Sequence, residues 1–237
     1  MSRPVPVPTR ALVVRLADYG DTDRIVGLFT RSRGLVSAIA KSARVSTKRF
    51  GGALQSGQLL DVVFGRSGGA LERLESATIV DAHLGLLTDL AKLDEAAVVL
   101  RALRDHLAEV EPDPELFDRA ARHLAELAVS GPDAVRLVAF RLDLFDRLGV
   151  GPELDRCVRC GRDAGERPAY VDPRQGGLVC RACGGGGHLV SAATRRLARG
   201  LRGGGSPLTE SADALALSTI LDAIAGFHLA TRGSADR

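Results

Sequence analysis

Ala11-Leu-Val-Val-Arg-Leu16 and Arg24-Ile-Val-Gly-Leu-Phe29 decide the fold of the first third of this 237-residue chain. Both stretches are short, apolar and rich in β-branched side chains, which favours strands. Residues 30–34 are polar and include a glycine, so they predict a tight hairpin turn. Residues 35–40 are apolar again and supply the returning strand.

Two more strands are expected after a basic interval. Residues 58–64 and about 70–80 are apolar runs, and the glycine-rich residues 65–69 supply the turn between them. Five short strands without a long helix are typical of a small antiparallel barrel, which we expect over residues 1–80. The interval between the third and fourth strands, Lys41-Ser-Ala-Arg-Val-Ser-Thr-Lys-Arg49, is cationic and rich in hydroxyl groups.

From residue 81 onward the apolar residues recur at helical spacing instead. Asp113 followed by Pro114 predicts the start of one helix, and Ser191 predicts the start of another. The expected helices span residues 84–107, 114–127, 135–148, 192–201 and 208–230. The sequence therefore predicts an α+β protein with a helical domain over 81–150, completed by the C-terminal helices within 191–230.

Four cysteines form the most specific motif of the chain. They stand as two C-x2-C pairs separated by 19 residues, a spacing typical of a zinc ribbon: Cys157, Cys160, Cys180 and Cys183. Gly161 and Gly184 each follow a pair and permit a close turn. Disulfides, two separate redox pairs and a ribbon without metal are the alternatives. Because four thiolates close a tetrahedral shell, we expect one structural Zn²⁺ within a ribbon domain over residues 151–190.

The charge is distributed unevenly. Residues 1–80 carry 12 Lys+Arg and 6 Asp+Glu, residues 81–156 carry 9 and 16, and residues 157–237 carry 11 and 7. The basic first segment is a candidate for phosphate contacts, although arginines that only solubilise the surface fit this imbalance equally well. The acidic middle segment is an ordinary solvated face, a surface that repels DNA, or one that faces a basic partner.

Several classes of protein lack support. The chain has no phosphate-binding loop of the G-x-x-x-x-G-K-[ST] type, and its five histidines stand singly, outside any metalloprotease or nucleophile motif. We therefore expect no enzyme activity. No apolar run approaches a membrane span, and the first ten residues lack a signal-peptide core. We expect a cytoplasmic, nucleoid-associated protein without a membrane partner.

The N-terminal run from Ala11 to Thr30, Gly34 and the Ala40-Lys41 pair resemble the RecO family of bacterial recombination mediators. The order of barrel, helices, four-cysteine ribbon and closing helices matches that family over essentially the whole chain. The resemblance implies an OB-fold at the N-terminus, DNA binding, strand annealing and loading of the RecA recombinase. It also implies RecR and the acidic C-terminal tail of single-strand-binding protein as partners.

An OB-type barrel with basic loops is a nucleic-acid platform, so the cations of the first segment are candidates for binding single- and double-stranded DNA. The candidate phosphate contacts are Arg15, Arg24, Arg31, Arg33, Lys41, Arg44, Lys48 and Arg49. The few aromatic residues there, chiefly Tyr19, Phe29, Phe50 and Phe64, predict weak sequence preference and reliance on phosphate contacts.

A second hypothesis places the acidic partner peptide on the tail helices. It needs a basic rim beside the apolar stripe from Leu217 to Phe227, and the candidates for that rim are Arg195, Arg196, Arg199 and Arg202. The alternative is that these arginines form a solvated helix face. The rival class of function is a zinc-ribbon adaptor or transcription-type regulator that acts through protein contacts, and an enzyme with a small ligand in the barrel ranks third.

Overall fold

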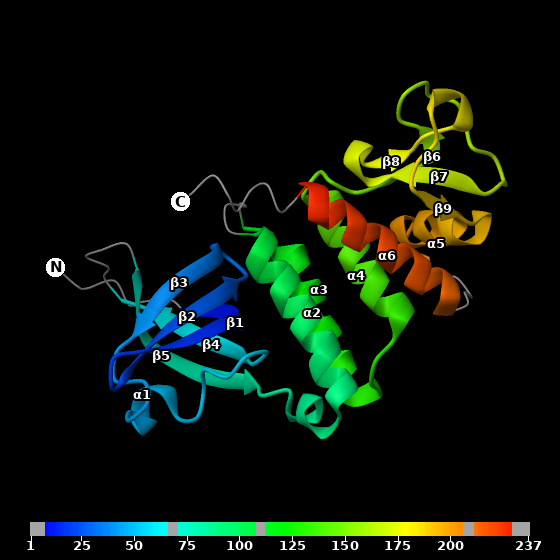
Figure 1. The fold of residues 1–237 in the computed structure, drawn as a ribbon. Helices are drawn as coiled ribbons and strands as arrows, with labels where there is room; N and C mark the ends of the chain where they lie inside the picture. The colour runs from blue at the N-terminus through cyan, green and yellow to red at the C-terminus, as the bar shows by residue number, and fades with distance from the viewer. Residues whose placement is uncertain (1–7, 66–70, 108–111, 206–210, 229–237) are drawn as a thin grey trace. The chain divides into compact units, whose positions relative to one another are not determined.

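The computed structural model describes residues 8–65, 71–107, 112–205 and 211–228 (Figure 1). The chain divides into two compact units, residues 1–132 and residues 133–237. The first unit holds a β-barrel and two helices, and the second holds three helices and a small sheet that carries the cysteines.

Five strands close the barrel of the first unit. They are β1 (Thr9–Tyr19), β2 (Asp23–Thr30), β3 (Gly34–Ala40), β4 (Leu59–Phe64) and β5 (Glu72–Asp81), in the order β1-β2-β3-β5-β4. β4 pairs with β1 to complete the closure, and only the contact of β3 with β5 is parallel. This order, with the single turn of helix α1 (Thr47–Phe50) between β3 and β4, is that of an OB-like barrel. The predicted barrel and its five strands are confirmed.

A bulge in β1 sets which side chains point outward. The register of β1 against β2 shifts between Val13 and Arg15, so one extra residue interrupts the alternation. Val13 lies fully buried in the barrel core, whereas Arg15 is exposed. The bulge thus directs a cation onto the outer surface of a strand whose first half is buried on both faces.

Two helices cover part of the outside of the barrel. The 3-10 turn η1 (Leu84–Thr88) leads into α2 (Leu90–His106), and α3 (Pro114–Ser130) follows. Phe117 of α3 packs against Phe29 of β2, with ring centroids 5.6 Å apart. As predicted, Asp113 caps α3 by accepting the N–H of Leu116 at 2.9 Å.

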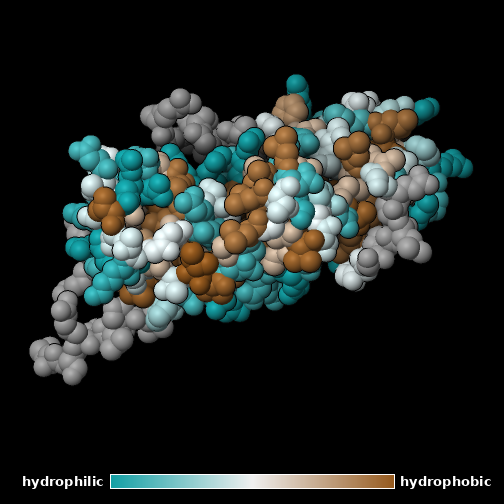
Figure 2. Space-filling model, turned by 90° about the horizontal axis from the view of Figure 1, so that it is seen from below, coloured by the Kyte–Doolittle hydropathy of each residue, from teal (hydrophilic) through white to brown (hydrophobic). Residues whose placement is uncertain are grey.

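Apolar side chains remain exposed where η1 meets α2. Leu84, Leu87 and Leu90 are 68%, 69% and 72% exposed. Figure 2 shows hydrophobic side chains interspersed with hydrophilic ones over one face of the molecule. Among the described large hydrophobic residues of the barrel unit only Val129, 84% exposed, exceeds these three leucines, which offer a surface for a protein contact.

Three helices of the second unit pack on one another: α4 (Ala134–Arg147), α5 (Ala192–Arg202) and α6 (Ser211–His228). The ribbon has four strands in the order β6-β8-β7-β9: β6 (Glu153–Cys157), β7 (Ala169–Asp172), β8 (Gly177–Leu178) and β9 (His188–Val190). Short 3-10 turns η2 (Pro173–Gln175) and η3 (Arg181–Cys183) connect them. Ser191 caps α5 by accepting the N–H of Thr194, as predicted.

Each predicted helix has a counterpart among the described residues. The boundary between the two compact units falls between residues 132 and 133. The helices α2 and α3 therefore belong to the unit of the barrel, and α4 belongs to the unit of α5 and α6. The division at residues 80, 150 and 190 stays a prediction. The ends of the expected 208–230 helix and of the 70–80 strand fall partly outside the described residues.

Arg195 fixes the ribbon to α5. It is 2% exposed, and its guanidinium donates to the carbonyl oxygens of Leu154, Gly165 and Arg167 at 2.7, 2.9 and 2.9 Å. A buried charge is tolerated only when its donors are satisfied in this way. Arg195 is therefore a structural residue of the second unit.

We expect Arg195→Met to lower the free energy of unfolding of this unit by about 3 kcal/mol, because three buried carbonyl groups lose a charged donor. Chemical denaturation followed by circular dichroism measures the change. Arg167→Met removes an exposed side chain without a described partner and is the matched control, for which we expect a change within about 0.5 kcal/mol. Equal destabilisation by the two substitutions would contradict the assignment.

Candidate nucleic-acid interface and metal centre

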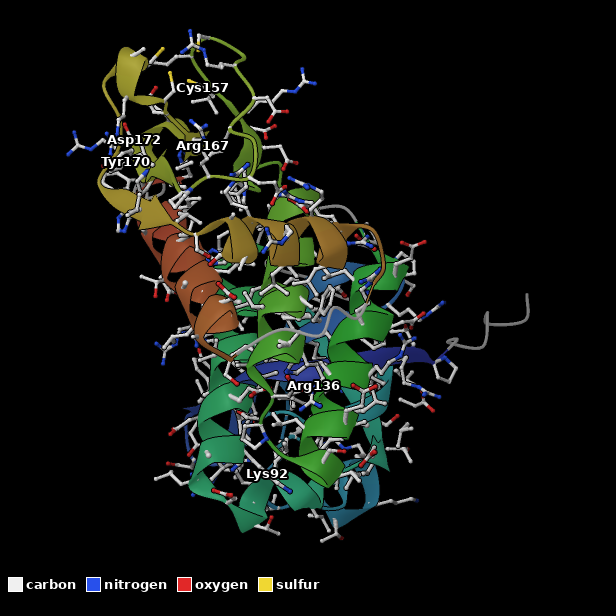
Figure 3. All side chains as sticks on the ribbon, turned by 90° about the vertical axis from the view of Figure 1, so that its right-hand side faces the viewer. Lys92, Arg136, Cys157, Arg167, Tyr170 and Asp172 are labelled. Carbon is white, nitrogen blue, oxygen red and sulfur yellow. The ribbon has the colours of Figure 1, made fainter. Side chains whose placement is uncertain are left out.

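The ribbon brings all four cysteines together. Cys157 ends β6, Cys160 follows in the turn, and Cys180 and Cys183 flank and close η3. Their four Sγ atoms lie within 4.8 Å of one another (Figure 3 labels Cys157). The cluster forms because two parallel segments, β6 and β8, each lead directly into one C-x2-C pair.

The arrangement of the four Sγ atoms fits tetrahedral coordination of one metal ion. The Sγ atoms of Cys160 and Cys180 are 3.8 Å apart, which is about the edge of a tetrahedron with metal–sulfur bonds of ~2.3 Å. A disulfide needs ~2.05 Å, so this pair is not bonded. The chain therefore holds four free thiols arranged compatibly with one structural metal ion.

Backbone amides and neighbouring thiols act on the cysteine pKa values in opposite directions. The N–H of Cys180 donates to Sγ of Cys157 at 3.3 Å, and this bond is the main reason why the pKa of Cys157 falls to about 6. Hydrogen bonds with the thiols of Cys180 and Cys160 raise the pKa of Cys183 to about 12. Four thiolates in one cluster repel one another, and a divalent cation would relieve that repulsion.

Two glycines complete the turns after the cysteine pairs. Gly161 has a φ of +72° and donates its N–H to the Cys157 carbonyl, and Gly184 has a φ of +109°. Both lie in the left-handed region that a side chain disfavours. The predicted role of these glycines is confirmed.

The most cationic stretch of the barrel unit forms one connected loop, which we call the cationic loop (residues 41–49). Its backbone is tied to the β1–β2 turn: the N–H of Ser42 donates to Asp23 at 2.7 Å, and the N–H of Arg44 donates to the Thr22 carbonyl at 3.0 Å. The loop is thereby held beside the barrel wall rather than left to move freely.

Within the cationic loop, three side chains are available to a ligand and one is not. Lys41, Arg44 and Lys48 are exposed and form no ion pair among the described residues. Arg49 instead donates to the Lys41 carbonyl at 2.5 Å and stacks over the Phe50 ring at 5.1 Å. Arg49 therefore supports the loop.

Two further candidates stand on the barrel strands β1 and β2, and one of them, Arg24, borders this loop. Arg24 lines the same hollow as Arg44, Ser46 and Thr47, with a volume of about 260 Å³. Its guanidinium is partly engaged, because it donates to Asp18 at 3.1 Å. Arg15, on the outer side of β1 opposite Gly27 of β2, is exposed and has no described partner.

The remaining candidates are held by carboxylates. Arg31 donates two hydrogen bonds to Asp118 of α3, at 2.9 and 3.0 Å, and these bonds lower the pKa of Asp118. Arg33 donates to Glu72 at 2.5 Å and lies over the ring of Phe64 at 4.9 Å. The two arginines lie at another hollow, of about 490 Å³, away from the cationic loop's own hollow.

Sequence reasoning missed Arg10, which lines that second hollow with Arg31 and Arg33. It too is paired, because it donates to Asp61 at 2.8 Å. The closeness of Arg10 to the β2–β3 turn follows from the barrel register, in which Ala11 faces Thr30, and only the pairing of the two strands could have indicated it.

The tail-helix hypothesis needs correction. Arg195 is buried, as described above, so it is not part of a basic rim. The other three candidates are exposed to different degrees but are paired: Arg196 with Glu166 at 2.6 Å, Arg199 with Asp155 at 2.7 Å and Arg202 with Asp146 at 2.7 Å.

The apolar stripe next to them is mostly core. Leu217, Leu221 and Ile224 are fully buried, and Ile220 is 3% exposed. Phe227 is half exposed, and Arg174 lies over its ring. The described residues therefore offer no open apolar groove along that stripe, because the helix uses it to pack within its own unit.

The fold and the site together define a class of protein. Its members combine an OB-like barrel that carries a cationic loop with a helical unit that carries a four-cysteine ribbon suited to a metal ion. Among the described helices, none combines the length and the hydropathy that a membrane span requires.

Comparison with known proteins narrows the class to one family. Residues 1–83 match the family description "Recombination protein O N terminal", and residues 87–233 match "Recombination protein O C terminal". The chain belongs to the RecO family of DNA repair proteins.

Curated relatives cover most of the chain. It is 36% identical over 240 residues to DNA repair protein RecO of Anaeromyxobacter sp. (strain Fw109-5), which covers 95% of this chain and 92% of that protein. It is 39% identical over 178 residues to DNA repair protein RecO of Anaeromyxobacter dehalogenans (strain 2CP-C), covering 75% and 70%. For DNA repair protein RecO of Myxococcus xanthus (strain DK1622), identity is 36% over 174 residues, covering 73% and 71%.

We expect the apoprotein to bind one Co²⁺ per chain with the intense sulfur-to-metal charge transfer and visible bands of a tetrahedral thiolate site, because four Sγ atoms surround one position. Ultraviolet–visible titration measures both the bands and the stoichiometry. Cys160→Ser should weaken the charge-transfer band, whereas Ser46→Ala, in the barrel unit, should leave it unchanged. An octahedral spectrum, or no spectrum, would exclude the site.

Proposed function

We propose that this chain is a non-catalytic recombination mediator. It binds single- and double-stranded DNA without strong sequence preference and anneals complementary strands. With RecR it promotes RecA loading onto strands coated by single-strand-binding protein. The proposal combines membership of the RecO family with the surface chemistry of the two units. Its place of action is the nucleoid in the cytoplasm.

One observation carries the DNA-binding part of the proposal. Lys41, Arg44 and Lys48 are exposed cations without carboxylate partners, and they stand on a loop that is tied to the wall of an OB-like barrel. Arg15 adds a fourth unpaired cation from β1. Such a set suits the phosphates of a nucleic-acid strand, since no internal ion pair has to break before a contact forms.

Weak sequence preference follows from the aromatic residues. Of the four aromatics named for the first 80 residues, Phe29 and Phe50 are 2% exposed, and the ring of Phe64 is covered by Arg33. Tyr19, 56% exposed, is the one that offers a free ring to a base. Affinity therefore depends chiefly on phosphate contacts, which carry no sequence information.

Annealing without nucleotide hydrolysis follows from the same electrostatics. Two strands repel each other through their phosphates, and a cationic protein surface reduces that repulsion when both strands are held. The mechanism needs no cofactor in the barrel. It assigns the metal a structural role, and the four-thiolate donor set favours Zn²⁺ in that role.

A protein-contact function has support of its own in the exposed leucines at the η1–α2 junction. This apolar surface fits a partner protein, and it favours an adaptor function in addition to DNA binding. The two functions are separated by a simple comparison, because an adaptor acts only with its partner whereas a mediator anneals strands by itself.

We expect the logarithm of single-strand affinity to fall with the logarithm of salt concentration at a slope of about −3.5, if about five phosphates are neutralised at ~0.7 each. Lys41→Ala, Arg44→Ala and Lys48→Ala together should bring the slope to about −1.4 and weaken binding at least tenfold at about 0.1 M salt. Fluorescence anisotropy with a labelled oligonucleotide measures both quantities.

The matched control neutralises the paired arginines instead, in the triple variant Arg10→Ala, Arg31→Ala, Arg33→Ala. We expect the affinity for the oligonucleotide to fall less than about threefold, because these guanidinium groups already bind carboxylates. If this control lost more affinity than the cationic-loop variant, the DNA interface would lie at the β2–β3 turn instead. A salt-independent affinity would refute phosphate binding altogether.

A further inference from the structure

The acidic side chains of the ribbon are all engaged. Its five carboxylates fall into two groups. Asp155 and Glu166 bind the α5 arginines Arg199 and Arg196. The other three accept backbone N–H groups within the ribbon: Glu153, Asp163 and Asp172.

The arginines of the ribbon, in contrast, face no carboxylate. Six of them lie between residues 153 and 190, all exposed, and none forms an ion pair among the described residues: Arg156, Arg159, Arg162, Arg167, Arg174 and Arg181. The local sequence is almost neutral, with six arginines against five acidic residues. Because the α5 arginines compensate two of the carboxylates, Asp155 and Glu166, six arginines remain against three carboxylates, and the ribbon has a cationic excess.

Three of these arginines border one hollow of about 670 Å³ within the ribbon: Arg162, Arg167 and Arg181. The lining also contains one carboxylate, Asp163, which accepts the N–H of Gly165, and is otherwise largely apolar, with Pro168 and Leu189 among its residues. Leu189 is 65% exposed. Figure 3 shows Arg167 and Tyr170 on the ribbon, in the same part of the molecule as Cys157.

The cysteine cluster adjoins this hollow. Cys157 and Cys180 belong to its lining, so a metal ion bound by the four cysteines would hold together the segments that carry the arginines. Arg181 is further positioned by Tyr170, because it lies over the ring at 5.5 Å and donates to the hydroxyl oxygen at 3.3 Å. The result is a hollow with a fixed frame and a cationic border.

We propose that this hollow is a second nucleic-acid-binding surface, which holds one strand by its phosphates while the barrel unit holds another. The inference rests on the proposed annealing function and deepens it. Guanidinium groups pair with phosphate oxygens, and the apolar wall accommodates an unstacked base or sugar. Annealing brings two nucleic-acid strands together, and among the described residues the cationic loop and the ribbon each carry a group of exposed cations without an ion pair, one group in each unit.

An acidic peptide is the competing occupant, since carboxylates also bind arginine. The number of cations favours a nucleic-acid strand as the occupant. Six unpaired guanidinium groups distributed over one small module suit a repeating polyanion, whereas a peptide end presents only a few carboxylates. The peptide is therefore kept as an outcome of the experiment.

The test uses the full-length, metal-loaded chain with Arg162→Glu and Arg167→Glu together. These residues are chosen because they lie in the hollow but are not adjacent to a cysteine. We expect the affinity for a first single strand to stay within about twofold of the unsubstituted chain, and the annealing rate of complementary oligonucleotides to fall at least fivefold. Energy transfer between two labelled, non-complementary strands bound to the same protein should fall in parallel.

The matched control is Arg156→Glu with Arg174→Glu, which changes the ribbon charge by the same amount outside the lining of the hollow. It should anneal within about twofold of the unsubstituted chain. Metal content and thermal unfolding confirm that both variants are folded. Equal losses in both variants would overturn the assignment to the hollow, since diffuse charge would then explain the effect.

The remaining outcomes separate this inference from the proposed function. If the unsubstituted chain anneals and the hollow variant anneals equally well, the second surface is wrong while the mediator function stands. If the unsubstituted chain neither binds nor anneals DNA, the proposed function itself fails. A labelled acidic peptide with an apolar end that binds the hollow and is lost in the variant, while annealing is unchanged, would make the hollow a peptide site.

Discussion

The two hydrogen bonds from Arg31 to Asp118 illustrate the constraint on which this account depends. A guanidinium group that already binds a carboxylate must give up that partner before it binds a phosphate, whereas an unpaired one gives up only water. In the first unit, Arg10, Arg31 and Arg33 bind carboxylates, whereas the exposed cations of the cationic loop do not. In the second unit it separates the arginines of α5 from those of the ribbon. We therefore propose that ion pairing, more than the number of positive charges, determines where a polyanion binds to this chain.

The backbone then places the unpaired cations. A β-bulge directs Arg15 outward where the buried stretch of β1, residues 11–14, ends, and Asp23, the first residue of β2, accepts the N–H of Ser42 from the cationic loop. In the ribbon the buried Arg195 performs the same task for segments that have little apolar core, and a metal ion bound by the four cysteines would add to it. Each proposed binding surface thus consists of exposed cations on a frame that other residues fix.

Much of the architecture was predictable from the sequence, because local patterns determine it. Alternating apolar runs gave the five strands, Asp113 and Ser191 gave two helix starts, and the spacing of the cysteines gave the metal cluster. What could not be predicted depends on residues far apart in the chain. Three features depend on residues that are 28 to 87 positions apart in the chain. They are the burial of Arg195, the ion pair of Arg31 with Asp118, and the ion pairs between ribbon carboxylates and α5. Charge counts within a segment do not reveal such pairs.

The most direct measurement is hydrogen–deuterium exchange of the full chain with and without a single-stranded oligonucleotide, at low salt. The account predicts that one strand protects backbone amides of residues 41–50 and of the adjoining β1, because the unpaired cations of the barrel unit are located there. Adding a second strand should extend the protection to the ribbon around Arg162 and Arg167. Protection confined to α5 and α6, or absent from residues 41–50, would contradict it.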